Sequence, residues 1–260
     1  EYVPVEEVIE ELKDYFKTNP DPDFITFSGA GEPTLHSGIG QILKIIRELK
    51  PDIRVALITN GTLFSDPALR KELLDVDVVL PSLDAATDSA FRRINRPRKE
   101  FTLEQYVQGL IDFRKQYHGK LWIEVMLVHD LNDTEQALAE LTAALKQIEP
   151  DEVHILQPTR PPVETWVQPP DEEGLLRARA ILGNVASVID SASGTFDLSG
   201  FTSLVDAVVS IVTRHPMRED ELVTTLNRWP PTDVNKTLKD LEDSGKAQVV
   251  ERYGCRFWSA

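Results

Sequence analysis

The sequence predicts an α/β fold of parallel strands and helices, followed by a small second domain of a different kind. Short apolar runs alternate with longer amphipathic runs over most of the chain, which is typical of βαβ units. The alternation stops at a polar stretch, 190–200, and a different pattern follows. A length of 260 residues allows one large core and a second, smaller one.

The apolar runs predict five strands, at 24–27, 54–58, 78–81, 121–128 and 153–156. The amphipathic runs predict helices between and after them, at 38–50, 67–74, 87–94, 103–117, 133–148 and 172–186. A further helical pattern, at 5–16, precedes the first of these strands. We therefore expect a partial (β/α)6 TIM-like barrel that lacks its first strand, with an open doubly wound sheet as the alternative.

The end of the chain predicts a winged helix-turn-helix domain. Three amphipathic segments, 204–213, 218–226 and 232–244, are followed by two strand patterns, 247–252 and 255–259. The expected domains are thus a barrel at 1–189, a linker at 190–200 and a winged helix at 201–260.

Composition limits the classes of partner. The chain has 28 basic and 43 acidic side chains, a formal net charge of −15, so it repels phosphate backbones and broad nucleic-acid binding is disfavoured. No apolar run approaches the ~20 residues of a membrane-spanning helix. The single cysteine, Cys255, excludes an internal disulfide and favours a cytoplasmic protein.

Three predicted strands end in polar residues suited to ligand binding. The strand 24–27 runs into Gly-Ala-Gly-Glu-Pro at 29–33, where glycines let the backbone turn sharply and approach a bound molecule. Asn60 follows the next strand, and Ser82 and Asp84 follow the third. Because parallel strands gather ligands at their carboxyl ends, we expect these residues to share one site. An ordinary tight turn at 29–33 and an N-cap role for Asp84 are the alternatives.

Arginines follow two of the later strands. Arg93 and Arg96 belong to an arginine-rich stretch at 92–98, and Arg160 lies in a proline-rich stretch at 157–166. A guanidinium group can bind a carboxylate or phosphate in bidentate fashion, which makes the three residues candidate substrate contacts. Solvated or internally paired arginines are the alternative.

Together these motifs resemble the radical S-adenosylmethionine (radical SAM) superfamily across residues 1–186, in a branch similar to the wybutosine-forming and activating enzymes. The resemblance implies that the methionine amino group of S-adenosylmethionine (SAM) is held by Gly29, Ala30, Gly31 and Glu32. It places Ser82 and Asp84 against the ribose or the methionine carboxylate, and Asn60 in the same cavity.

The resemblance also implies roles for later residues. The adenine is bordered by Val128 and by the backbone from Ile155 to Gln157. The cosubstrate carboxylate or the substrate contacts Arg93, Arg96 and Arg160. No catalytic residue is assigned.

One element of the resemblance is absent from the sequence. The family binds a [4Fe–4S] cluster through a CxxxCxxC loop, because thiolates are the soft ligands that such clusters need. The only cysteine here, Cys255, lies in the predicted winged helix. We expect the cluster ligands upstream of residue 1 and expect residues 1–260 alone to be inactive; a degenerate relative that never reduces SAM is the alternative.

The resemblance implies an iron–sulfur oxidoreductase that, in complete form, takes an electron from a donor and reductively cleaves SAM. The resulting 5′-deoxyadenosyl radical abstracts a hydrogen atom from an unidentified substrate. We expect the winged helix to recruit a peptide, protein or RNA. DNA binding is disfavoured because the third helix of this domain mixes lysines with carboxylates. The alternative functions are a non-catalytic SAM-fold regulator and a nucleic-acid-binding winged-helix protein.

Overall fold

The computed structural model describes residues 3–29, 31–159, 162, 164–189, 198, 200–214 and 217–259. The chain divides into two compact units. The first consists of Glu1–Leu156 and Pro170–Val188, and the second of Gln157–Pro169 and Ile189–Ala260. The segment that leaves the fifth strand thus belongs to the second unit.

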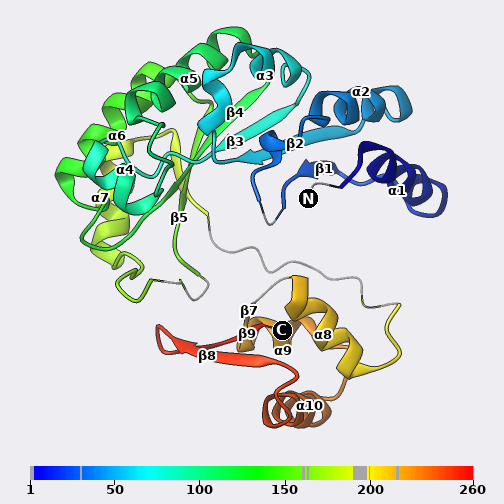
Figure 1. Ribbon diagram of the computed structural model, residues 1–260. Helices are drawn as coiled ribbons and strands as arrows, with labels where there is room; N and C mark the ends of the chain where they lie inside the picture. Colours follow the sequence, from blue (N-terminus) through cyan, green and yellow to red (C-terminus); the bar gives the residue numbers. More distant parts are fainter. Residues whose placement is uncertain are drawn as a thin grey trace. The chain divides into compact units, whose positions relative to one another are not determined.

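The first unit is built on a parallel sheet whose strands follow one another in sequence order (Figure 1). Within the described residues the sheet has six strands: β1 (Phe24–Phe27), β2 (Arg54–Thr59), β3 (Val78–Pro81), β4 (Lys120–Met126), β5 (Glu152–Leu156) and β6 (Ala186–Val188). A doubly wound sheet reverses its strand order at a switch point, and this sheet does not. The predicted α/β class with a partial TIM-like barrel is confirmed, and the doubly wound alternative is wrong.

The sixth strand was not predicted. The helix expected to run to residue 186 ends at Leu182, because Gly183 has a positive φ of 81° and ends the helical conformation. Residues Ala186–Val188 then pair in parallel with β5. A strand of three residues is too short to give a recognisable alternation, so the sequence pattern concealed it.

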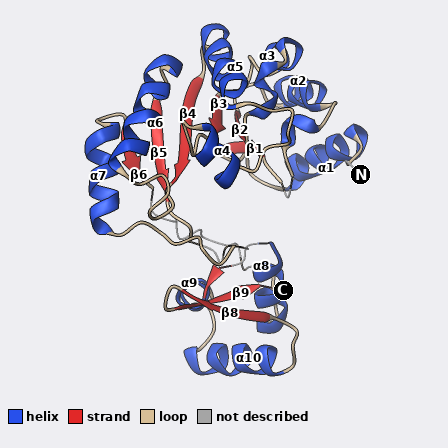
Figure 2. Cartoon of the chain, turned by 60° about the vertical axis from the view of Figure 1, so that its left-hand side comes forward, coloured by secondary structure: helices blue, strands red, loops and turns tan. Residues whose placement is uncertain are grey.

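Helices connect the strands and cover the sheet (Figure 2). They are α1 (Val5–Thr18), α2 (Ile39–Leu49), α3 (Pro67–Glu72), α4 (Asp88–Ile94), α5 (Leu103–Gln116), α6 (Glu135–Ile148) and α7 (Glu172–Leu182). In α2, for example, buried side chains recur at helical spacing: Ile39, Ile42, Leu43 and Ile46. Such apolar faces pack on the sheet and form the main core.

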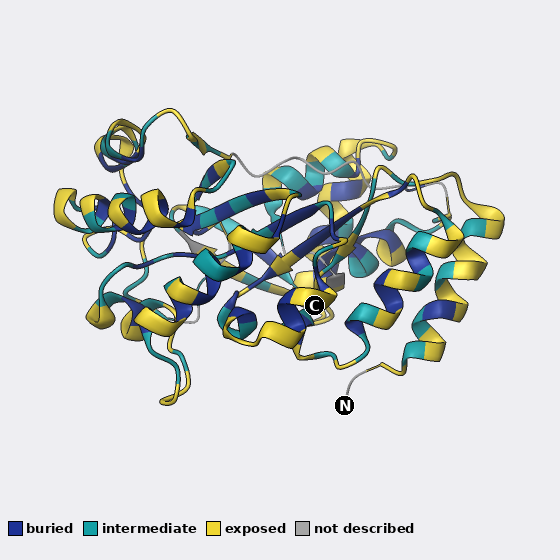
Figure 3. Cartoon of the chain, turned by 90° about the horizontal axis from the view of Figure 1, so that it is seen from above, coloured by how far each residue is buried: buried dark blue, intermediate teal, exposed yellow. Residues whose placement is uncertain are grey.

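The two faces of the sheet differ in burial. Side chains alternate between faces along a strand. Leu57 and Val125 are fully buried in the core, whereas their neighbours Ile58 and Met126 are 40% and 41% exposed. Figure 3 shows this uneven burial along the strands. Parallel sheets are commonly covered on both faces, but the face of this sheet that carries Ile58 and Met126 is less buried than the other. We call it the open face.

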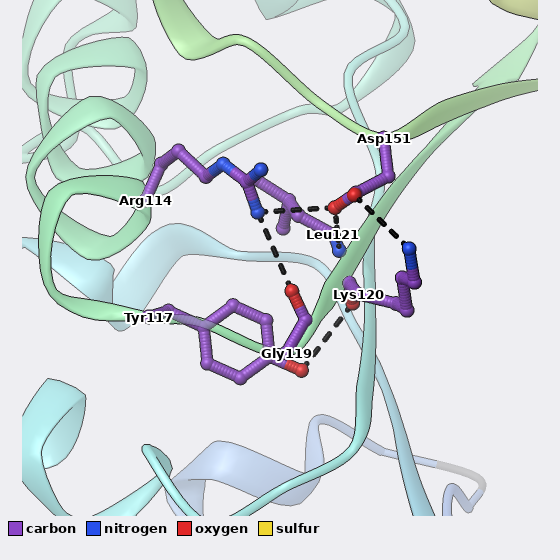
Figure 4. Close-up of polar contacts among 6 residues, drawn as sticks. All are labelled: Arg114, Tyr117, Gly119, Lys120, Leu121 and Asp151. Atoms are coloured by element: carbon purple, nitrogen blue, oxygen red, sulfur yellow. Dashed lines mark hydrogen bonds and ion pairs between the residues drawn. The ribbon is translucent and has the colours of Figure 1, made fainter.

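A network around Asp151 fixes the amino-terminal ends of β4 and β5 (Figure 4). The carboxylate accepts from Arg114 Nη1 at 3.0 Å and from the Leu121 amide N–H at 2.9 Å, and Lys120 Nζ lies 3.4 Å away. Burial alone raises the pKa of Asp151, but the Leu121 hydrogen bond and the charges of Arg114 and Lys120 outweigh it and hold the pKa below its usual value. Asp151 therefore stabilises the fold in its ionised form.

The second unit has its own core and an antiparallel sheet. Its elements are α8 (Leu204–Arg214), β7 (Met217–Arg218), α9 (Glu219–Thr225), α10 (Pro231–Asp243), β8 (Gln248–Arg252) and β9 (Cys255–Ser259). The strands have the order β7-β9-β8, and β7 was not predicted. Trp258 is almost fully buried among α8, α9 and α10 residues. The arrangement matches the predicted helices and hairpin, and the winged-helix assignment stays a prediction.

No helix among the described residues is both long and apolar enough to cross a membrane. Most of the predicted linker, residues 190–197 and 199, lies outside the described residues.

Candidate active site

Glu32 is the centre of a hydrogen-bond network that joins the ends of β1 and β2. It is the N-cap of a short 3₁₀ helix, η1 (Pro33–Leu35), and accepts from the Thr34 amide N–H at 3.1 Å. The hydroxyls of Thr34 and Thr59 donate to the same oxygen, Oε1, at 2.6 and 2.5 Å. The Asn60 amide N–H donates to Oε2 at 2.7 Å. Since each carboxylate oxygen accepts about two hydrogen bonds, Oε2 retains an acceptor position.

Open space lies beside Glu32 at Gly29 and Gly31. Within the described structure, a Cβ at either glycine meets no atom within 4 Å. Their φ angles lie outside the left-handed region, so backbone strain does not require glycine at either position. Both line a cavity of about 710 Å³ whose apolar walls come from α1 and α2, including Leu12 and Ile42. A ligand can therefore approach the backbone here. Ala30, which was predicted to lie between them in the site, is outside the described residues.

The turn after β2 does require glycine. Gly61 has a φ of 70°, and a Cβ there comes within 3.1 Å of the Tyr106 ring and 3.3 Å of Pro81. In this turn the Asn60 side chain folds over the residues that follow it, and its Oδ1 accepts from the Thr62 amide at 3.0 Å and from the Thr62 hydroxyl at 2.6 Å. Asn60 is thereby held next to Glu32.

Asp84 joins the end of β3 to β4. Its Oδ1 accepts from the Met126 amide N–H at 2.8 Å, and its Oδ2 accepts from Asn95 Nδ2 at 2.8 Å. Burial raises the pKa of the Asp84 carboxyl, and these two hydrogen bonds partly oppose that rise. The alternative that Asp84 caps the next helix is wrong, because Thr87 is the N-cap of α4.

Asn132 holds the loop after β4 against the same strand ends. It is 1% exposed, and its Nδ2 donates to the carbonyl oxygens of Asp84 and Met126 at 2.7 and 2.8 Å. Its Oδ1 accepts from the Val128 amide at 2.6 Å. The N-cap of α6 is Thr134, so Asn132 holds the loop and does not cap the helix.

Tyr106 of α5 connects the ends of β2 and β3, because its ring lies against Gly61 and its hydroxyl reaches Ser82. Its hydroxyl donates to the Ser82 carbonyl oxygen. Burial raises the pKa of Tyr106, and the negative charges of Asp84 and Glu32 raise it further. The Ser82 amide N–H also donates to the Thr59 carbonyl oxygen at 3.1 Å, next to the contact between Asn60 and Glu32. The predicted residues Glu32, Asn60, Ser82 and Asp84 are therefore brought together at the carboxyl ends of β1, β2 and β3. Tyr106 itself was missed, because only its position beneath Gly61 reveals its role.

The remaining predicted residues are placed differently. Val128 is buried beside Asn132, and the Ile155 side chain is fully buried in the main core, so only its backbone is open to the predicted role. Gln157 belongs to the second unit, where it lines a cavity of about 380 Å³. Arg93 and Arg96 are exposed on α4 and directly after it. Arg160 lies outside the described residues.

The residues present do not fit an iron–sulfur cluster. The sequence has one cysteine, Cys255, in the second unit. The part of the chain that the structure describes contains no group of three or more His, Cys, Asp or Glu side chains able to hold a metal ion. Residues 1–260 thus lack the three thiolates that a [4Fe–4S] cluster of this kind needs.

Relatives with known sequences come from several organisms. The chain is 32% identical over 250 residues to a protein of Brachyspira hyodysenteriae named GTPase Obg, with 95% of this chain and 36% of that protein covered. It is 30% identical to a UPF0026 protein of Methanocaldococcus jannaschii, covering 81% of this chain and 66% of the relative. A UPF0026 protein of Synechocystis is 35% identical over 62% of this chain and 58% of its own length. The chain thus spans between about a third and two thirds of these relatives.

Solved structures share the fold of the first unit. A radical SAM methyltransferase from Sphaerobacter thermophilus superposes with a TM-score of 0.55 and 20% identity, covering 71% of this chain and 56% of that one. SuiB from Streptococcus suis, solved with bound SAM, gives a TM-score of 0.51 and 16% identity over 68% of this chain and 39% of its own. At such identities the likeness concerns the fold.

The fold and the site define a class: a parallel partial barrel with a candidate ligand site at the carboxyl ends of its strands. A family model described as the radical SAM superfamily matches residues 1–142. The chain belongs to the radical SAM superfamily.

Proposed function

We propose that the first unit binds SAM at the carboxyl ends of β1, β2 and β3, as the SAM-binding part of a radical SAM enzyme. The observation that carries the proposal is the Glu32 carboxylate, which four hydrogen bonds hold in place and which keeps an acceptor position beside two open glycines. An ammonium group is the donor that such an acceptor binds most strongly.

The residues of the chain then have separate roles. Glu32 accepts from the methionine amino group, and Gly29 and Gly31 let the ligand approach the backbone closely. Asn60 and Ser82 offer polar groups to the ribose, and Asp84 holds the neighbouring loops in register through Met126 and Asn95. Val128 and the backbone of Ile155 and Leu156 border the adenine. Arg93, Arg96 and Arg160 are proposed contacts of a carboxylate on the cosubstrate or the substrate.

When bound, SAM would supply the radical chemistry of the superfamily through its reductive cleavage. This reaction requires an electron from an iron–sulfur cluster, and residues 1–260 hold no ligand set for one. We therefore assign to this chain the binding and orientation of SAM, and assign the cluster to cysteines outside residues 1–260. Because the chain spans only part of its relatives, the activity of the whole protein is part of the proposal.

Gly31→Val tests this proposal. Calorimetry should detect SAM binding to the wild-type chain, and the valine should weaken it at least about tenfold by filling the ligand volume. Because a Cβ at Gly31 meets no neighbour, the variant should unfold at the wild-type urea midpoint. Gly200→Val is the matched control, since Gly200 has equally open surroundings in the second unit. Absence of SAM binding by the wild-type chain would overturn the proposal.

The second unit is proposed to recruit a peptide, protein or RNA segment for the same enzyme. Its cavity of about 380 Å³ combines Tyr253 and Phe257 with the charged Arg218 and Glu221, a mixture suited to a peptide more than to a nucleic acid. The alternative function, a non-catalytic SAM-responsive regulator, is favoured by the lack of cluster ligands in these 260 residues. Anaerobic reconstitution of a longer relative, followed by reduction, distinguishes the two by whether SAM is cleaved.

A further inference from the structure

Four polar side chains form a row across the open face of the sheet. In the strand register, Ser82 lies beside Glu124, Glu124 beside His154, and His154 beside Ser187. Glu124 and Met126 are two residues apart on β4, so the row lies on the same face as the exposed Met126. We call Ser82, Glu124, His154 and Ser187 the polar row. It begins at a residue of the proposed SAM site and crosses to the far edge of the sheet.

The centre of the polar row is unsatisfied. Glu124 is partly buried, and among the described residues its carboxyl makes no hydrogen bond or ion pair. His154 is 13% exposed, and its Nε2 lies 3.1 Å from Glu152. The Trp122 ring lies 5.2 Å from the imidazole, and its buried Nε1 has no hydrogen-bond partner within the described structure. A partly buried carboxyl without a partner is costly, so its presence here points to a ligand.

The charges around the row are unbalanced. Three carboxyl groups belong to the row or lie close to it: Glu124 within it, Glu152 at 3.1 Å from the His154 imidazole, and Asp84 two residues after Ser82. Burial raises the pKa of Glu124, the nearby imidazole opposes the rise, and the negative charge of Asp84 adds to it. The next cation along β4, Lys120, already lies 3.4 Å from Asp151. A positive group placed in the row would relieve both the burial and the repulsion of these carboxylates.

An apolar strip accompanies the row. Ile58 and Leu80 lie side by side in the register of β2 and β3, on the same face as Ser82. Trp122 lies on that face of β4, two residues before Glu124. Its ring offers both apolar surface and attraction for a cation. A hydrocarbon chain can thus lie along the strip while its charged end reaches Glu124.

We propose that the polar row binds the alkylammonium or guanidinium group of the substrate, with Glu124 as its main contact and Trp122 beneath its hydrocarbon part. This inference deepens the proposed function and rests on it, because the row continues from the SAM site. The substrate class is therefore a cationic molecule, such as one with a free lysine-like or arginine-like end. An anionic group is disfavoured at the row itself by the same three carboxyl groups.

The test compares n-butylammonium with the neutral n-butanol as probes of the intact 260-residue chain. Amide chemical-shift changes in nuclear magnetic resonance spectra should appear on β4 and β5 for n-butylammonium, with an affinity at least about tenfold above that for n-butanol. Glu124→Gln should remove this preference. Glu172→Gln, which makes the same charge change at an exposed position of α7, should retain it.

Equal affinity for the two probes, or an unchanged preference in Glu124→Gln, overturns the inference. The wild-type probe comparison and the position of the shifts decide the matter even where the glutamine variant does not fold. SAM affinity is measured on the same samples. If the wild-type chain binds SAM but shows no preference for n-butylammonium, only the inference is overturned. If the wild-type chain does not bind SAM, the proposed function is overturned.

Discussion

Carboxylates at the two ends of the parallel sheet have different partners. At the amino-terminal end, Asp77 and Asp151 each accept from a backbone N–H and also pair with an arginine: Arg47 at 2.6 Å and Arg114 at 3.0 Å. At the carboxyl end, Glu32 and Asp84 accept from amides and hydroxyls, and neither has an ion pair with a described residue. One end thus neutralises its charges internally, while the other leaves negative charge for a cationic ligand.

In this fold the amino-terminal carboxylates serve stability, and the carboxyl-end carboxylates are available to a ligand. An internal ion pair gives its full effect without a ligand, so the amino-terminal carboxylates stabilise the folded chain on their own. Carboxylates held by neutral donors are fixed in position while their charge remains available.

Replacing an amino-terminal carboxylate should have the largest effect on stability. Asp151→Asn leaves Arg114 without its ion pair and weakens the contact with Leu121, so unfolding free energy should fall by about 1–3 kcal/mol. Urea denaturation measures it. Asp14→Asn is the control, because its pair with Lys17 is fully exposed and its loss should not move the midpoint. If Asp151→Asn lost no more unfolding free energy than Asp14→Asn, the amino-terminal carboxylates would not have the stabilising role assigned to them.

Replacing a carboxyl-end carboxylate should mainly affect ligand binding. In Glu32→Gln the amide retains an acceptor oxygen for the threonine hydroxyls, but loses the charge offered to an ammonium group. SAM affinity should fall at least about tenfold, with a smaller stability loss of about 1 kcal/mol. Calorimetry and urea denaturation measure the two quantities on one sample. A larger stability loss than in Asp151→Asn, with SAM affinity unchanged, contradicts the contrast.

The pH dependence of stability should have opposite signs at the two ends. The lowered pKa of Asp151 gives a stabilisation that is present above the unfolded pKa of about 3.9 and is lost as pH falls through the folded pKa. The raised pKa of Asp84 gives a contribution that is present below about 3.9 and is lost as pH rises through its folded pKa.

Urea denaturation of wild type and the two asparagine variants between pH 3 and 7 gives this comparison. Relative to wild type, Asp84→Asn should gain stability as pH rises, while the deficit of Asp151→Asn should shrink as pH falls. These shifts are the smallest of the expected effects. If the stability of Asp84→Asn and of Asp151→Asn, each relative to wild type, changed with pH in the same direction, the opposite pKa shifts assigned to the two carboxyl groups would be wrong.

The periodicity of apolar residues predicted much of the fold, and the position of polar residues after the strands predicted part of the candidate site. The strands β1 to β5 gave apolar runs of recognisable length, and the glycine-rich loop before Glu32 predicted the candidate site. The loop's partners could not be predicted, because Thr59 and Tyr106 meet Glu32 and Ser82 only through the strand register and the packing of α5. Glu124 and His154 alternate with buried residues inside apolar strands, so a sequence reading treats them as interruptions of the run.

The buried Asn132 has a consequence for the kinetics of recognition. A single amide side chain already holds the carbonyl groups after β3 and β4, together with the Val128 amide, in fixed positions. Because these loops are already ordered, binding of a ligand restricts little further backbone motion, and the entropy cost of association is small. Encounter with this surface should therefore proceed close to a rigid-body docking, at a rate governed by diffusion and orientation.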